Sequence, residues 1–156
     1  MENKFNEIKS VRFIDDQPPD LSFPRRGQLG GNDSELGKPA EILAAGEGIE
    51  TMLALKSALP SLPMIAGLSA NHLAALDLPP ALRRLYIARD NNAAGLNAAE
   101  RLRGRTDGID VRELVPVYAD FNLDLCRLGA AVLRAHLADQ FVPSDLGTFR
   151  RPPQSN

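Results

Sequence analysis

The sequence lacks several features that would place it in a specialised class of proteins. Its 156 residues include one cysteine and no tryptophan, which excludes an internal disulfide framework and a cysteine-rich zinc site formed by this chain alone. No run approaches the roughly 18 apolar residues of a membrane-spanning helix. The opening segment MENKFNEIKS is polar and charged, unlike a secretion signal. We therefore expect a cytoplasmic protein with no membrane partner.

An excess of charge of one sign is also absent. Lys and Arg total 18 and Asp and Glu total 20, so the formal net charge is only -2. Binding of nucleic acid, if it occurs, has to come from a local basic surface, because the whole chain has no attractive field. The content of 44% hydrophobic and 24% charged residues is ordinary and is enough to form the core of one domain.

Turn-forming residues and apolar runs divide the chain into three parts. Residues 1–39 contain pairs of prolines and glycines and one short strand-like segment, 11–14, so we expect an N-terminal extension that is partly irregular. Over residues 40–140, short apolar runs alternate with stretches of helical spacing. This alternation predicts an α/β domain with a parallel sheet and a C-terminal helix. Residues 141–156 are expected to be a loose tail.

The order of the apolar runs predicts the individual elements. Strands are expected at residues 41–45, 62–68, 85–88 and 109–115. Helices are expected to begin at Ile49, after a Ser69 cap, near Gly95 and near Phe121. In the last helix, positions that recur every three or four residues are expected to pack on the domain: Leu125, Cys126, Gly129, Val132, Leu133, His136 and Leu137.

Acidic residues follow the carboxyl ends of these predicted strands. Glu47 comes after the first strand, Asp90 after the third, and Asp120 lies in the loop after the fourth. Loops at the carboxyl ends of parallel strands open on one edge of the sheet, where ligands bind. Carboxylates gathered there repel one another unless a divalent cation joins them, and Mg²⁺ prefers such oxygen ligands. The pattern predicts a site for Mg²⁺, or Mn²⁺ in its place, that acts on a phosphodiester, with Glu47 as the acid-base group.

Simpler interpretations exist for these residues. Glu47 and Asp90 could each be loop acids that cap the following helix, because carboxylates there accept hydrogen bonds from free backbone N–H groups. Arg83, Arg84 and Arg89 flank the strand that leads to Asp90. Guanidinium groups suit phosphate contact, so we predict that these arginines bind nucleic acid, with a solvated surface as the alternative.

Three segments resemble the motifs of the Toprim domain, in particular its plasmid and phage primase-like branch. They are GEGIET at 46–51, DNNAAG at 90–95 and DFNLD at 120–124. The resemblance implies the Toprim fold, a compact, mostly parallel sheet with helices on both faces, in which a glutamate is the acid-base group and aspartates hold Mg²⁺. It also implies primase-type nucleotidyl transfer in DNA replication. The implied partners are DNA or an RNA primer, nucleotides, and a helicase or zinc-binding module supplied elsewhere.

One position departs from the family pattern. The pattern has an aspartate two residues after Asp90, where this sequence has Asn92. An amide oxygen still ligates Mg²⁺, but it brings no charge. In the third motif, Leu123 separates Asn122 from Asp124, whereas the family pattern usually has these two residue types adjacent. We therefore rank Asp120 above Asp124 as a predicted ligand. The predicted ligands are thus Glu47, Asp90, Asn92 and Asp120. Two alternatives stay open: a catalytically weakened Toprim module that binds nucleic acid or a replication partner, and a Toprim nuclease.

Overall fold

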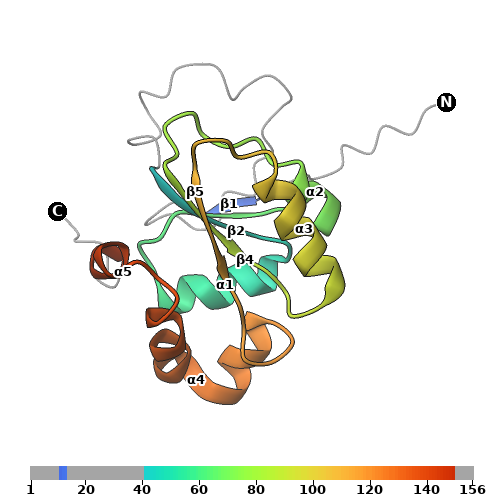
Figure 1. Ribbon diagram of the computed structural model, residues 1–156. Coiled ribbons are helices and arrows are strands. Elements are labelled where there is room, and N and C mark those ends of the chain that lie inside the picture. Colours follow the sequence, from blue (N-terminus) through green and yellow to red (C-terminus); the bar gives the residue numbers. More distant parts are fainter. Residues whose placement is uncertain (1–10, 14–40, 150–156) are drawn as a thin grey trace.

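The computed structural model describes residues 11–13 and 41–149, which form a sheet covered by helices (Figure 1). Within these residues the strand order is β1-β3-β2-β4-β5. Strand β1 runs antiparallel to β3, and the other neighbours are parallel. The mostly parallel sheet is therefore confirmed, and part of the N-terminal extension completes one edge. The strands are β1 (Val11–Phe13), β2 (Ile42–Gly46), β3 (Met64–Ala66), β4 (Arg84–Ala88) and β5 (Asp110–Leu114).

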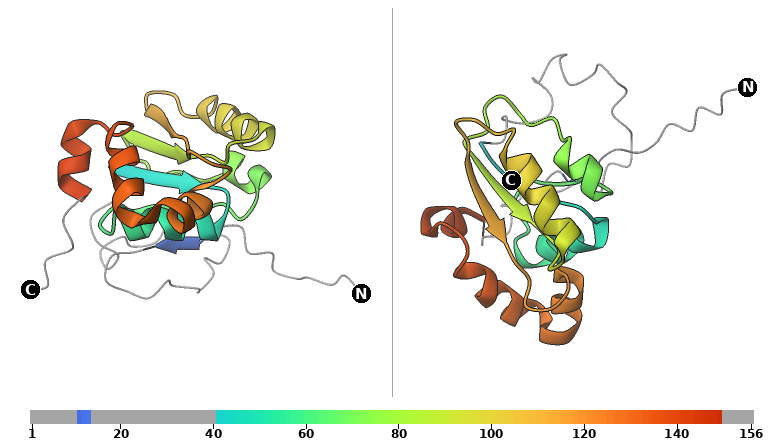
Figure 2. Two further views of the ribbon diagram at one scale, coloured as in Figure 1. Left: turned by 90° about the horizontal axis from the view of Figure 1, so that it is seen from below. Right: turned by 45° about the vertical axis from the view of Figure 1, so that its right-hand side comes forward.

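Helices cover both faces of the sheet, as predicted (Figure 2). Helices α2 and α3 pack on one face, and α1, α4 and α5 pack on the other. Ser69 caps α2 as expected, because its side chain accepts a hydrogen bond from the backbone N–H of His72. No helix in the described part of the chain is long and apolar enough to cross a membrane. The helices are α1 (Ile49–Ala58), α2 (Ala70–Ala74), α3 (Ala93–Arg103), α4 (Phe121–Ala138) and α5 (Pro143–Phe149).

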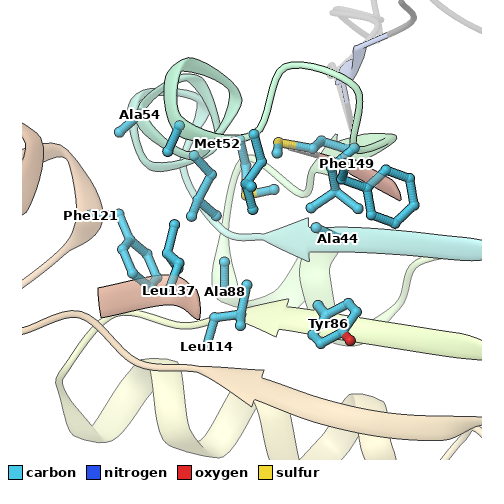
Figure 3. Packing of buried hydrophobic residues seen from close by; sticks show 14 of the residues in the cluster. Ala44, Met52, Ala54, Tyr86, Ala88, Leu114, Phe121, Leu137 and Phe149 are labelled. Carbon is cyan, nitrogen blue, oxygen red and sulfur yellow. The ribbon is translucent and has the colours of Figure 1, made fainter. Parts of the chain in front are cut away.

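The central strands are buried on both faces, which explains their continuous apolar sequences. Successive side chains of a strand point to opposite sides. In β2, Ile42 and Ala44 therefore join the core beneath α1 and α4, while Leu43 and Ala45 join the core beneath α2 and α3. Figure 3 shows the first of these cores, with Ala44 among its side chains. This packing fixes the direction of β2 and with it the position of the loop that follows.

The prediction of a loose tail is wrong for residues 143–149. They form α5, in which Asp145 and Phe149 are buried. Asp145 Oδ2 accepts hydrogen bonds from Arg84 Nη1 and from the Tyr86 hydroxyl, both at 2.7 Å. Burial, followed by this bond to Asp145, raises the pKa of Tyr86 to about 12. Contacts distant in sequence thus hold a short helix whose interior Gly147 does not favour it. Residues 150–156 of the predicted tail lie outside the described residues.

Helix α4 also differs from the expected continuous packing face. Gly129 has φ 79° and ψ 165°, so two helical stretches meet there across a kink. Leu133 and Leu137 are buried as predicted, but Val132 is 52% exposed and Cys126 is exposed. The positive φ at Gly129, which glycine adopts without strain, interrupts the helical periodicity. Residues spaced by three and four on the two sides of Gly129 therefore do not lie on one continuous helical face.

Candidate functional site

Glu47 lies directly after β2, at the edge of the sheet formed by the carboxyl ends of the parallel strands. It follows Gly46, where an added Cβ atom would lie 2.9 Å from the Ala88 carbonyl oxygen. Only glycine lets β2 and β4 approach so closely at this point. Burial raises the pKa of Glu47, the charge of Asp90 raises it further, and a hydrogen bond from the Ala70 backbone lowers it. Glu47 therefore lies within reach of the acid that follows the neighbouring strand.

Asp90 follows β4, the parallel neighbour of β2. Burial raises the pKa of Asp90 and the charge of Asp120 raises it further, while a hydrogen bond from the Thr51 hydroxyl at 3.5 Å lowers it. Among the residues that the structure describes, no Lys or Arg forms an ion pair with Glu47, Asp90 or Asp120. The edge thus collects negative charge that described basic side chains do not neutralise. We call these three residues the acidic edge.

The helix caps separate two of these acids from ordinary capping residues. Helix α1 has Gly48 at its N-cap and no side-chain cap hydrogen bond. Helix α3 is capped by Asn92, not by Asp90. Neither Glu47 nor Asp90 therefore caps the helix that follows it, and the simpler interpretation of these two residues is wrong.

The remaining predicted ligands, Asn92 and Asp120, do serve as helix caps. Asn92 Oδ1 accepts a hydrogen bond from the Gly95 N–H, and Asp120 Oδ1 accepts one from the Leu123 N–H, both at 2.7 Å. Each side chain still has acceptor capacity, including the second carboxylate oxygen of Asp120.

The donor atoms of the acidic edge suit Mg²⁺, because they are hard oxygens with excess negative charge. Their present arrangement is open, however. Within residues 11–13 and 41–149, no three His, Cys, Asp or Glu side chains are already grouped to hold a metal ion. A bound cation would therefore have to draw Glu47, Asp90 and Asp120 closer together.

The three predicted arginines lie at opposite ends of β4. Arg83 and Arg84 come at its start, and Arg89 follows its end. Two carboxylates hold Arg84, at 2.8 and 2.7 Å, and Arg83 pairs with Glu41 at 3.2 Å. A strand of this length separates its two ends by roughly 15 Å. The structure therefore does not bring Arg83 and Arg84 to the acidic edge.

Arg89 is the predicted arginine that lies beside the acidic edge. Its Nε bonds Glu113 Oε2 at 2.8 Å, and its Nη1 donates to the Asp90 carbonyl oxygen at 3.4 Å. Arg103 also pairs with Glu113, at 3.1 Å. Arg89 therefore brings a guanidinium group next to Asp90, in a position suited to phosphate contact.

Two further residues shape the site, although neither is among the ligands predicted from the sequence. Thr51 is buried in α1, and its hydroxyl donates a hydrogen bond to Asp90. Its sequence signals are its place at the end of the GEGIET segment and its polar character among apolar packing positions. Asp124 is fully buried, and its two oxygens accept hydrogen bonds from the backbone N–H groups of Val117 and Tyr118, both at 2.8 Å. Asp124 thus fixes the loop that precedes Asp120.

Gly95 lets helix α3 pack directly against the loop that carries Asp90. An added Cβ atom would lie 2.5 Å from the Asp90 carbonyl oxygen and 3.0 Å from the Asp90 nitrogen. We expect Gly95→Ala to displace this loop and to lower the free energy of unfolding by about 2 kcal/mol. Gly104→Ala is the matched control, because its Cβ would meet nothing closer than 3.6 Å. Equal urea midpoints for the two variants would contradict this close packing.

Comparison with known proteins gives one family match and two similar solved structures. A family model described as the Toprim domain matches residues 42–131. One similar structure is a DNA primase domain from Pseudomonas aeruginosa, with 23% identity and a TM-score of 0.47, covering 65% of this chain and 34% of that one. The other contains the zinc-binding and RNA polymerase domains of the Aquifex aeolicus primase, with 19% identity and a TM-score of 0.44, covering 65% and 26%. This chain therefore spans about a third of the first chain and about a quarter of the second. The search of curated proteins gives no match.

Proposed function

Because this chain belongs to the Toprim domain family, we propose that it binds Mg²⁺ at the acidic edge and performs primase-type nucleotidyl transfer on nucleic acid in DNA replication. Mn²⁺ is the alternative ion. The observation that supports this most directly is that the charge of Asp90 acts on Glu47 and the charge of Asp120 acts on Asp90, while no described basic side chain pairs with any of the three. We further propose membership of the plasmid and phage primase-like branch, on the motifs at 46–51, 90–95 and 120–124.

Each residue has a defined part in this proposal. A bound ion would stabilise the negative charge that develops on phosphoryl oxygens. Asp90 and Asp120, with Asn92, would hold the ion through their oxygens. The Glu47 carboxylate would accept the proton of the attacking hydroxyl, and its raised pKa suits proton transfer closer to neutral pH. Arg89 would contact a phosphate of the substrate.

The proposed partners are DNA or an RNA primer, together with nucleotides. Primase-type synthesis also needs template engagement, and we propose that a zinc-binding module or a helicase outside this chain provides it. The composition of the chain supports a separate zinc-binding module, because one cysteine and two histidines are too few for a cysteine-rich zinc site.

Asn92 favours a second candidate function. Its amide oxygen caps α3 by accepting a 2.7 Å hydrogen bond from the Gly95 N–H. The helix cap at this position therefore does not require a carboxylate. Asparagine and aspartate are equally good N-caps, and the exchange removes one charge from the edge without disturbing the helix. A module that binds nucleic acid or a replication partner, with weakened metal binding, is consistent with that exchange.

Calorimetric titration with Mg²⁺ tests the proposed ion site. We expect the unmodified protein to bind weakly and Asn92→Asp to bind about tenfold more tightly, because the variant adds a charged ligand while keeping the helix cap. Asp90→Asn is expected to lose binding. Asp107→Asn is the matched control, because Asp107 is exposed and precedes β5 at the other end of the sheet. If Mg²⁺ binds only to Asn92→Asp, the second candidate replaces the first.

A further inference from the structure

The loop between β5 and α4 presents an aromatic and cationic pair next to the acidic edge. The guanidinium carbon of Arg127 lies over the Tyr118 ring, 4.9 Å from its centroid. Asn91 ties this loop to the loop after β4. Its Nδ2 donates to the Tyr118 carbonyl at 3.3 Å, and its backbone N–H donates to the Ala119 carbonyl at 2.8 Å. The pair therefore lies beside the chain segment that carries Asp90.

A buried carboxylate holds this loop in place. Asp124 is fully buried and accepts the backbone N–H groups of Val117 and Tyr118, both at 2.8 Å. Above this anchor, Val117 is 48% exposed, Tyr118 is half-buried and Arg127 is exposed. The loop thus combines an ordered backbone with accessible apolar, aromatic and cationic side chains. Such a surface binds a partner with little ordering cost.

We infer that Tyr118 and Arg127 form a stacking platform for a base of single-stranded nucleic acid whose backbone runs to the acidic edge. The inference rests on the proposed function, because that function makes a polynucleotide the substrate of the edge. Aromatic rings and guanidinium planes both stack on unpaired bases. Arg127 also forms no ion pair with any residue of 11–13 or 41–149, so its charge remains available to a phosphate.

The chemistry of the platform favours a single strand over a duplex. Bases in a duplex are stacked on one another, whereas a single strand exposes their faces to an aromatic side chain. The platform uses no base-edge hydrogen-bond donor or acceptor, so it should accept different bases. DNA and RNA share this chemistry, and oligonucleotides of both kinds are therefore needed in the test.

Fluorescence anisotropy with labelled oligo(dT) and oligo(rU) of about 12 nucleotides tests the platform in the full chain. Tyr118→Ala is expected to weaken binding about tenfold, whereas Tyr118→Phe keeps a ring and stays within about twofold. Arg127→Gln is expected to weaken binding. It should also reduce the slope of log affinity against log salt concentration by about one, the loss of one phosphate contact. Arg112→Gln is the matched control, because Arg112 is an exposed arginine paired with Asp110 at the other end of β5.

Tyrosine emission gives a second measurement. The chain has no tryptophan and two tyrosines, of which Tyr86 is fully buried. Emission from Tyr118 should therefore report stacking directly. We expect each oligonucleotide that binds to quench the Tyr118 emission of the unmodified protein. Tyr118→Phe is expected to bind without this change.

Two results would overturn the platform: equal affinity of Tyr118→Ala and the unmodified protein, or no binding of either oligonucleotide by the unmodified protein. Equal affinity leaves the proposed function standing, because the Mg²⁺ titration depends on Asp90 and Asn92. Absence of all oligonucleotide binding also counts against a nucleic-acid substrate, and the Mg²⁺ titration then tests the ion site by itself. Conversely, loss of binding in Tyr118→Ala supports the platform even if the protein neither binds Mg²⁺ nor transfers nucleotides. A preference for oligo(dT) or oligo(rU) identifies the strand without changing the inference.

Discussion

Asp145→Ala is expected to lower the free energy of unfolding by about 3 kcal/mol, because it breaks a buried charge network. Asp145 is 2% exposed and accepts hydrogen bonds from Arg84 and from the Tyr86 hydroxyl, both at 2.7 Å. Without it, Arg84 keeps only Asp110 as a described carboxylate partner. The Tyr86 hydroxyl, whose oxygen accepts the Val142 N–H at 3.1 Å, would lose its own acceptor in the core. The variant should therefore release α5 from the sheet.

Urea unfolding measures this effect through the shift in midpoint at constant slope. Tyr86→Phe removes the hydroxyl alone and is expected to cost about 1 kcal/mol. Ser144→Ala is the matched control in the same helix, because Ser144 is exposed, and it should change stability by less than about 0.5 kcal/mol. If Asp145→Ala is as stable as Ser144→Ala, the network does not hold α5.

The parts of the fold that follow local rules could be predicted from the sequence. The Ser69 cap was predicted because serine before an apolar stretch satisfies a free backbone N–H, and its bond to His72 confirms it. Helix α5 was missed because its stability comes from Arg84 and Tyr86, 61 and 59 residues away along the chain. A short segment with proline and glycine gives no local sign of such partners.

The candidate site shows the same division between local and distant information. The rule that loops after parallel strands open on one edge placed Glu47 and Asp90 near each other, and the charge of Asp90 does raise the pKa of Glu47. Nearness in sequence was a poor guide for Arg84, because β4 carries it to the end opposite Asp90. Likewise, a helical spacing rule placed Cys126 in the core, although it is exposed.

Glu47→Gln is expected to reduce Mg²⁺-dependent nucleotide incorporation on a single-stranded template by about 100-fold or more, the usual contribution of a positioned proton acceptor. The amide has nearly the same shape as the carboxylate but cannot accept the proton. Stability should not fall, because burial and the charge of Asp90 both raise the pKa of Glu47, so a neutral side chain relieves strain in the folded state at neutral pH.

Glu50→Gln is the matched control for this experiment. Glu50 is exposed in the first turn of α1, three residues beyond Glu47, and it is the same residue type. We expect Glu50→Gln to retain full incorporation and Glu47→Gln to lose it at an unchanged or higher melting temperature. If both variants keep full incorporation, Glu47 is not the proton acceptor. If only Glu47→Gln loses it while remaining folded, the carboxylate at the end of β2 is required for the chemistry.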